Sequence, residues 1–534
     1  MKRFIIFLTA FNFCLGAAIA APVKTKMYSN KRVIKFTVNS KTDDWTISPE
    51  LNPDILFLYS PTEKTKFVKF VSDIDSIEFT VNVNDSVDFT VILNQKDTAY
   101  TRIVFTNQIA NTLSETEKIR MLSEFWSEAK YNFVFIDKLT FDWDSLYQSY
   151  IPKVLAAKND YEFYDLMDLF ATSLKDLHTD VSWRGKSRYT KYVPLLVKYF
   201  GDSLFVTNSH KNFVPLGSKI LEINGLPFDK YMEKEIVPYI NSDFKPTVKY
   251  LAENRLFMSD LDSKKMNVTY QTPDGKIVTQ LMPRNNEDGM DESIGKMPDY
   301  SRNLIDIEWL EDGIARVAIN TFYPEEKVIS LFESIKDTLY SAKGIMIDLR
   351  ENRGGSTGTG WHVLNHIIKT PYYLNFAYQE RINSSVGRAS GNYIKENENF
   401  FKDRAYQTFM PDTMHVPDSI KQFDCPIVVL ISEKTCSAAE DFLIILAERP
   451  DRPKFIGRPS MGSTGLPLVM WDFPENVQAR MCARRVLYPY SLKPFTEGIT
   501  PDILVEYTYD EYMRDNYDKD VEVAVAELKK MIPK

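Results

Sequence analysis

The feature that most constrains the fold is the alternation of strands and helices from about residue 302 to the C-terminus. Apolar runs such as "GIMIDLR" (344–350) and "PIVVLIS" (426–432) are typical of buried strands, and segments with helical spacing separate such runs. Strands that alternate with helices predict an α/β core, which we expect to contain a mixed sheet. We assign residues 300–534 to this core.

The 534-residue chain is too long for one hydrophobic core, so we expect a multidomain protein. Residues 21–110 alternate apolar and polar positions between short polar turns, which predicts an all-β, sandwich-like module. Residues 111–190 contain amphipathic helices, the first opened by the capping box Ser114…Glu117. Residues 191–290 return to strands with glycine turns, and a polar stretch from 284 to 300 reads as a linker.

The first 20 residues, "MKRFIIFLTAFNFCLGAAIA", have two cations, an apolar centre and an Ala-Ile-Ala end. This pattern is typical of a secretory signal peptide, and we expect cleavage after Ala20. The residue before Cys14 is Phe13, which is not the small residue that a lipid-attachment site requires. The prediction is therefore an exported protein, periplasmic or extracellular.

Charge and composition exclude several classes of protein. The net charge is −8, and loss of Lys2 and Arg3 with the signal peptide makes it −10. Since the chain has no stripe dense in lysine or arginine, nucleic acid is not an expected partner. No other stretch approaches the roughly 20 apolar residues of a membrane span. Three cysteines remain after cleavage (Cys425, Cys436 and Cys482), which favours free buried thiols over a disulfide framework, although one bridge stays open.

Ser437 lies where the 426–432 strand gives way to the helical segment "SAAEDFLIILAERP". A serine at a helix start is most often an N-cap, whose hydroxyl accepts a hydrogen bond from a free N–H. The alternative is a nucleophile, because small neighbours leave room for a substrate and the free N–H groups of a helix start can stabilise an oxyanion.

The segment "IDLRENRGG" (347–355) also ends a predicted strand in charged residues and two glycines. One interpretation is structural, with Asp348 and Arg350 as an ion pair ahead of a glycine turn. The other is that a glycine N–H donates into an oxyanion hole, where a Cβ would block the substrate.

These segments together resemble the C-terminal processing (tail-specific) serine peptidase family. "DLRENRGG" is followed about 80 residues later by "VVLISEKTCSAAEDF" and then by "EGITPDILVE" (497–506), in the order and spacing of that family. The resemblance covers roughly residues 115–534 and implies an α/β peptidase core. Residues 191–290, through "PLGSKILEINGLPFDKY", resemble the PDZ domain that many members insert.

The resemblance implies a set of site residues. The nucleophile falls on Ser437, and the oxyanion donors fall on the Ala438 N–H and the Gly354-Gly355 turn. Where the lysine-type members carry their base, this chain has Ser463, while Lys434 and Lys493 lie at other spacings. The chain is therefore closer in pattern to the tricorn-core-like branch.

That branch uses a histidine base, which falls on His178 in "LKDLHTDVSW", and an orienting glutamate, which falls on Glu497. Asp502 and Asp176 remain alternatives for the acid. The implied Ser-His-Glu site needs no metal or organic cofactor. A histidine base with an ordinary pKa of about 6.5, raised by Glu497, predicts an activity that rises near pH 6–7.

The remaining histidines are assigned to other roles. His362 and His366 stand four apart on a predicted helix and could imitate a metal pair. Because no third ligand follows at motif spacing, we interpret them as packing residues and expect no metal. His210 and His415 lie in polar segments.

The sequence thus predicts an exported serine endopeptidase that cleaves peptides or unfolded protein tails through an acyl-enzyme. The alternative is a catalytically inactive protein of the same fold that binds peptides or a lipophilic ligand, as the retinoid-binding branch of the family does. A third hypothesis is an assembly factor whose N-terminal module carries the function. The oligomeric state and the substrate preference are not predicted.

Overall fold

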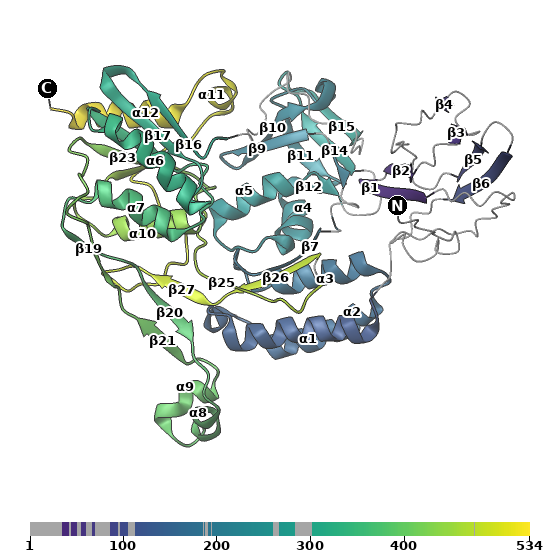
Figure 1. Cartoon of the computed structure of the whole chain (residues 1–534), viewed down its shortest axis with the longest axis horizontal. Coiled ribbons are helices and arrows are strands. Elements are labelled where there is room, and N and C mark those ends of the chain that lie inside the picture. Colours follow the sequence, from purple (N-terminus) through teal and green to yellow (C-terminus); the bar gives the residue numbers. More distant parts are fainter. Residues whose placement is uncertain are drawn as a thin grey trace, which may run out of the picture.

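The computed structural model describes residues 113–533, except 185, 187–190, 194, 260–265, 283–301 and 475. It also gives the backbone of six strands between residues 35 and 104. The predicted signal peptide (1–20) and the predicted linker lie outside the described residues. Figure 1 shows the arrangement of the elements.

The N-terminal strands pair only in the antiparallel sense. They form a two-stranded sheet, β1-β2, and a four-stranded sheet of order β4-β3-β5-β6. Their bounds are β1 Lys35–Lys41, β2 Asp44–Glu50, β3 Ile55–Tyr59, β4 Phe67–Lys69, β5 Ser86–Leu93 and β6 Asp97–Val104. The all-β character agrees with the sequence, whereas a sandwich packing of the two sheets stays a prediction.

Three helices form the next segment: α1 Glu115–Asn132, α2 Trp143–Ala156 and α3 Asp160–Thr172. The predicted capping box is present, because Ser114 Oγ accepts from the Glu117 N–H and Glu117 Oε2 accepts from the Ser114 N–H. The buried faces of the helices pack with strands β7 (Asp180–Trp183) and β26 (Val477–Cys482). Because β7 pairs with β26, the helical segment is joined to the C-terminal part of the chain.

Residues 191–282 form a separate antiparallel sheet of order β15-β14-β11-β10-β9, with its own hydrophobic core. The predicted hairpin through Gly275 is present, and this glycine has φ +88°, which favours glycine. The strands are β8 Lys191–Tyr192, β9 Leu195–Phe200, β10 Ser203–Ser209, β11 Lys219–Ile223, β12 Leu226–Pro227, β13 Met258–Ser259, β14 Met266–Gln271 and β15 Ile277–Met282; the helices are α4 Phe228–Tyr231 and α5 Lys245–Arg255.

The α/β core is built on a mixed sheet of order β16-β17-β18-β23-β24-β28. β16 is antiparallel to β17, and the other neighbours are parallel. The strands are β16 Ile305–Trp309, β17 Ile314–Ile319, β18 Gly344–Asp348, β23 Ile427–Ile431, β24 Lys454–Gly457 and β28 Ile503–Leu504. The predicted mixed α/β core is confirmed.

Successive residues of the central strands point to opposite faces of the sheet, and helices cover both faces. One face packs against α6 (Glu325–Leu339), α7 (Thr357–Ile367) and α10 (Ala438–Ala447). The other packs against α12 (Lys519–Met531), as Figure 1 shows at the C-terminal end of the chain. The buried strands are therefore apolar throughout, which explains their continuous hydrophobic runs.

The rest of the core segment forms small sheets around this body. An arm between α7 and β23 extends away from it, with α8 and α9 between strands β20 and β21 (Figure 1). The bounds are β19 Tyr372–Leu374, β20 Ala377–Arg381, α8 Ser385–Ser390, α9 Glu398–Phe401, β21 Tyr406–Phe409, β22 Thr413–His415, β25 Pro467–Val469, β27 Arg484–Leu487 and α11 Tyr509–Met513. The cysteines Cys425, Cys436 and Cys482 are free thiols, as expected.

None of the described helices has the length and apolar character that a bilayer-spanning segment requires.

Candidate active site

Ser437 occupies the turn between β23 and α10 in a backbone conformation that non-glycine residues rarely adopt. Its φ is 57° and its ψ is −128°. Such a conformation costs on the order of 1–3 kcal/mol and persists only where the surrounding structure enforces it. Although Ser437 stands at the N-cap position of α10, its side chain makes no capping hydrogen bond. The structure therefore does not use this hydroxyl as a helix cap.

The Ser437 hydroxyl instead faces His178. Ser437 Oγ lies 3.2 Å from His178 Nε2, and His178 Nδ1 lies 2.6 Å from Ser463 Oγ. In the tautomer with the hydrogen on Nδ1, His178 donates to Ser463 Oγ and its Nε2 can accept a hydrogen bond from Ser437 Oγ. The three side chains come from separate parts of the sequence and form one line of hydrogen bonds.

His178 lies in the loop between α3 and β7, as expected. This loop is fixed from the far side, because Thr179 Oγ1 accepts a hydrogen bond from the Cys482 N–H at 3.0 Å. The pairing of β7 with β26 continues the attachment from Asp180 onward. A residue of the helical segment is thereby brought to the carboxyl end of β23, where open α/β sheets bind their ligands.

The pKa of His178 is lowered to about 4, first by burial and then by the nearby cations Arg480 and Arg484. The imidazole is thus neutral at pH 7 and able to accept a proton. The expectation that Glu497 raises this pKa above about 6.5 is wrong in direction. The two arginines that help to lower it lie more than 300 residues away in sequence, so the sequence alone gave no sign of them.

Glu440 holds the Ser463 turn against α10, the helix that follows Ser437. Its carboxylate accepts hydrogen bonds from the N–H groups of Gly462 (2.6 Å) and Ser463 (2.8 Å) and from Ser460 Oγ (2.6 Å). The Ser437 N–H in turn donates to the Ser463 carbonyl at 2.8 Å. Burial raises the pKa of Glu440 to about 7, against the lowering effect of these donors. This anchoring role of Glu440 was not predicted from the sequence.

The predicted acid, Glu497, lines a cavity of about 840 Å³ together with Ser463 and Asp176. Among the described residues, the hydrogen-bond partners of the His178 ring are Ser437 and Ser463, not Glu497. A Cβ on Gly462 would lie 3.1 Å from the carbonyl carbon of Glu497, so the Glu497 backbone lies against the Ser463 turn. The structure thus brings Glu497 to the site without a direct contact to the base.

The two alternative acids are engaged elsewhere. Asp502 pairs with Arg452, at 2.6 and 2.8 Å. Asp176 is partly buried and accepts a hydrogen bond from Thr179 Oγ1, and desolvation raises its pKa to about 6. Neither carboxylate is a described hydrogen-bond partner of the His178 ring, although the backbone N–H of His178 donates to Asp176.

The glycine turn after β18 lies directly against Ser437. A Cβ on Gly354 (φ +93°) would lie 2.7 Å from Ser437 Cβ and 2.9 Å from the Ala438 nitrogen. The Gly354 N–H donates to Asn352 Oδ1 at 2.8 Å, so it is not available as an oxyanion donor in this conformation. The bridge between Phe322 and Gly355 uses the N–H groups of Phe322 and Ser356, which leaves the Gly355 N–H outside that pairing.

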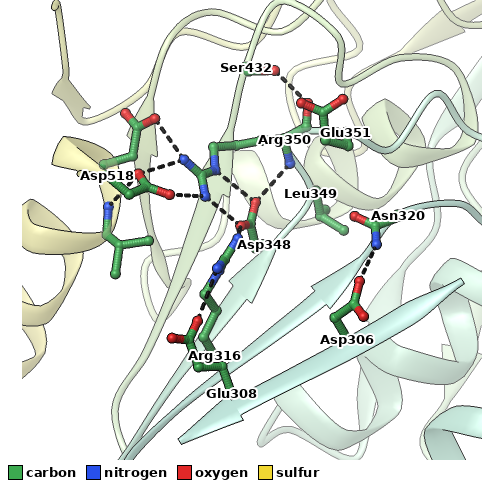
Figure 2. Close-up of polar contacts among 12 residues, drawn as sticks. Asp306, Glu308, Arg316, Asn320, Asp348, Leu349, Arg350, Glu351, Ser432 and Asp518 are labelled. Atoms are coloured by element: carbon green, nitrogen blue, oxygen red, sulfur yellow. Dashed lines mark hydrogen bonds and ion pairs between the residues drawn. The ribbon is translucent and has the colours of Figure 1, made fainter. Parts of the chain in front are cut away.

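Behind this turn, the charged end of β18 forms the ion pair that the sequence suggested (Figure 2). Arg350 contacts Asp348 at 2.7 Å and Asp518 at 2.8 Å, and Arg316 also contacts Asp348, at 2.8 Å. Burial alone would raise the pKa of Asp348, but the two guanidinium groups outweigh it and hold the pKa well below its usual range. Asp348 and Arg350 are therefore structural, while the glycines beyond them reach the site.

The pair His362 and His366 has a third neighbour that the sequence interpretation missed. Glu333, on α6, places a carboxylate oxygen beside both rings. No third ligand follows the histidines at motif spacing, as the sequence indicated, but an upstream helix supplies a carboxylate that the sequence interpretation did not consider.

Comparisons with known proteins agree with this architecture. Residues 313–505 match the model of peptidase family S41, and residues 114–171 match that of the tricorn protease C1 domain. The crystal structure of mature CPAF is similar with a TM-score of 0.57 and 16% identity, over 78% of this chain and 98% of that one. The structure of mature CPAF complexed with lactacystin gives 0.54 and 15%, over 78% and 97%. No curated protein sequence matches the chain.

The class that the fold and the matches define is that of the serine-type peptidases. More particularly, residues 313–505 match peptidase family S41, and the segment before them matches the tricorn protease C1 domain. The predicted resemblance to this family and to its tricorn-like branch is confirmed. At their low identity, the two CPAF structures support the fold alone. Peptidases of this family act on peptides or proteins.

Proposed function

We propose that this protein is an exported serine endopeptidase in which Ser437 is the nucleophile and His178 the general base. The observation that carries the proposal is the 3.2 Å separation of His178 Nε2 and Ser437 Oγ, with Ser437 held in a strained backbone conformation at a helix start. Nucleophile and base within hydrogen-bond reach, with a third group orienting the base, is the arrangement that acyl transfer needs.

The proposed reaction follows from these contacts. His178 Nε2 takes the Ser437 proton while Oγ attacks the peptide carbonyl, and the Nδ1–H···Ser463 bond orients the resulting imidazolium. The oxyanion is stabilised by the N–H groups of Ala438 and Gly355. His178 then protonates the leaving amine, and water hydrolyses the acyl-enzyme through the same base.

For the acid of the site we retain Glu497, which we propose acts through the Ser463 hydroxyl. Ser463 and Glu497 line the same cavity, and Ser463 Oγ already accepts from the histidine. A hydroxyl can accept one hydrogen bond and donate another, so it can link an imidazole to a carboxylate. Gly354 serves as the close-packing residue of the turn and not as a donor.

The wider assignment also remains a proposal. We propose that residues 1–20 are removed on export, so that the mature chain begins at Ala21. We further propose that residues 191–290 are a PDZ-like domain that captures peptide tails by adding a strand to its sheet. N-terminal sequencing of the protein from its native compartment tests the first statement, since an intact Met1 contradicts it.

A fluorophosphonate probe tests the active site itself. We expect covalent labelling of the wild-type protein, no labelling of Ser437→Ala, and labelling of His178→Ala slower by several orders of magnitude. Peptide mapping of the labelled protein should place the adduct on Ser437. A folded wild-type protein that takes no label and cleaves no unfolded substrate would instead support the inactive peptide- or lipophile-binding alternative.

A further inference from the structure

A second cluster of polar side chains lies on α6 and α7, outside the Ser437 site. His362 and His366 are one helical turn apart on α7, and Glu333 faces them from α6. Glu333 Oε1 is 2.8 Å from His362 Nε2 and 3.7 Å from His366 Nε2. The three potential ligand atoms all lie within 4.8 Å of one another, a separation that one metal ion can bridge.

His366 supplies an independent sign that a ligand is missing from this cluster. Its side chain is 1% exposed, and Nε2 is buried without a hydrogen-bond partner. Nδ1 lies 3.0 Å from the Lys421 carbonyl oxygen, so Nδ1 carries the hydrogen and Nε2 keeps its lone pair. A buried acceptor left unpaired is costly, whereas an imidazole fixed in this way by a backbone carbonyl is the usual state of a metal-bound histidine.

The other two members of the cluster, His362 and Glu333, lie on its solvent-exposed side. Lys336 binds Oε2 of Glu333, while Oε1 lies between the two rings and is hydrogen-bonded to His362 Nε2. The His362 side chain is 23% exposed and that of Glu333 is 37% exposed, so the open side of the cluster reaches solvent.

We propose that Glu333, His362 and His366 bind a Zn²⁺ ion that joins α6 to α7. Two imidazole nitrogens and one carboxylate oxygen, with water on the exposed side, are a ligand set that zinc accepts. The hydrogen bond between His362 and Glu333 satisfies those two residues without an ion, but it leaves His366 Nε2 unpaired. A ligand shared by all three residues would satisfy His366 Nε2 as well.

The position of this site gives the ion a mechanical role. α7 begins immediately after the Gly354-Gly355 turn, and its N-cap residue Ser356 donates a hydrogen bond to Glu325 at the start of α6. The two helices are therefore joined at the end that carries the turn. Zinc would join them a second time, farther along both helices, and so stabilise the pair.

Zinc binding to the full-length chain without an affinity tag tests the proposal. After removal of metal with a chelator, we expect one Zn²⁺ per chain by elemental analysis and a Tm that rises with added Zn²⁺. Glu333→Gln and His362→Ala, both at partly exposed positions, should fold normally and lose at least about 100-fold in Zn²⁺ affinity, since even second-layer changes cost 10–100-fold. His366→Gln should behave alike if it folds.

The matched control is His415→Gln, an exposed histidine on β22 that should leave zinc affinity unchanged. Replacement of zinc by Co²⁺ should give a visible spectrum without thiolate charge-transfer bands, which separates this site from binding at the three cysteines. The proposal is overturned if wild-type protein takes up no stoichiometric zinc, or if Glu333→Gln and His362→Ala bind it as tightly as wild type does.

Discussion

The carboxyl ends of β18 and β23 are neighbours in one sheet, yet the polar residues that follow the two strands have different roles. At β18, Asp348 and Arg350 form an ion pair with one another, and Arg350 forms a second ion pair with Asp518. After β23, the Ser437 hydroxyl is kept out of any capping bond and faces a histidine. Polar residues at a strand end therefore point to a functional site when neighbouring residues do not already hold them in structural ion pairs or helix caps.

The largest effect is expected at the β23 end. Ser437→Ala should reduce turnover by roughly 10⁴-fold or more, because the nucleophile and its base act as a unit. Its unfolding free energy should change by less than about 1 kcal/mol, since the hydroxyl caps no helix. Steady-state kinetics with denaturant unfolding measure both. Turnover near the wild-type level in folded Ser437→Ala would contradict a catalytic role for the β23 end.

At the β18 end the expected effect is on stability. Arg350→Met leaves Asp348 and Asp518 without this partner and should lower the unfolding free energy by about 3–5 kcal/mol. Turnover per folded molecule should stay within a few-fold of wild type. The exposed Lys529, paired with Asp312, is the matched control, and Lys529→Met should cost less than about 1 kcal/mol. Loss of turnover in folded Arg350→Met would assign catalytic importance to this end as well.

The glycine turn connects the two strand ends, and Gly354→Ala tests the contact between them. The new Cβ would overlap Ser437 Cβ, so we expect turnover to fall about 100-fold, as for a displacement of about 1 Å in an active site. Gly275→Ala is the control, because Gly275 has a similar φ of +88° but no atom within 4 Å of the added Cβ. It should cost about 1–2 kcal/mol of stability and leave turnover unchanged. Equal turnover in both variants would contradict the contact.

The pH dependence of kcat/KM tests the lowered pKa of His178. Because the pKa of His178 is lowered to about 4, the base is protonated only in acid. A plot of kcat/KM should therefore rise with pH through a midpoint near 4 and stay level from about pH 5.5 to 8. A midpoint between 6 and 7 would assign the acid limb to another group, such as Asp176 or Glu440, whose pKa values are raised to about 6 and 7.

The smallest effects are expected at the lysines that a lysine-type mechanism would need. Lys434 Nζ is paired with Glu351 at 2.9 Å, and Lys493 is exposed beyond the turn. Lys434→Ala and Lys493→Ala should each keep turnover within about two-fold of wild type, since neither side chain contacts Ser437 among the described contacts. If a lysine variant were inactive while His178→Ala stayed active, the general base would be that lysine and not His178.

Much of the site could be predicted from the sequence because its motifs are local. The change from a buried strand to a helical pattern places Ser437 between β23 and α10 as expected, and the segment around His178 lies between a helix and a strand. Family spacing then pairs the two residues, although 259 positions separate them. Such pairing cannot be deduced from periodicity, because it depends on how β7 meets β26.

What escaped prediction depends on tertiary burial. The direction of the His178 pKa shift is set first by desolvation and then by Arg480 and Arg484, which no local pattern relates to His178. Ser463 bonds to His178 Nδ1, and Glu440 in turn holds Ser463. Both contacts arise because the turn that contains Ser463 packs against α10. Glu333 was missed because it reaches the histidines from another helix.

The Glu440 anchor also determines which parts of the site can move independently. Ser437 belongs to α10, and the Glu440 carboxylate of the same helix fixes the Ser463 turn, so these two hydroxyls form a single rigid unit. His178 comes from the helical segment, and among the described contacts its ring meets that unit through both ring nitrogens, while Thr179 and β7 attach the same loop to β26. The distance between His178 and Ser437 therefore depends on how β7 is paired with β26, whereas the distance between Ser437 and Ser463 is set within the unit that Glu440 holds together.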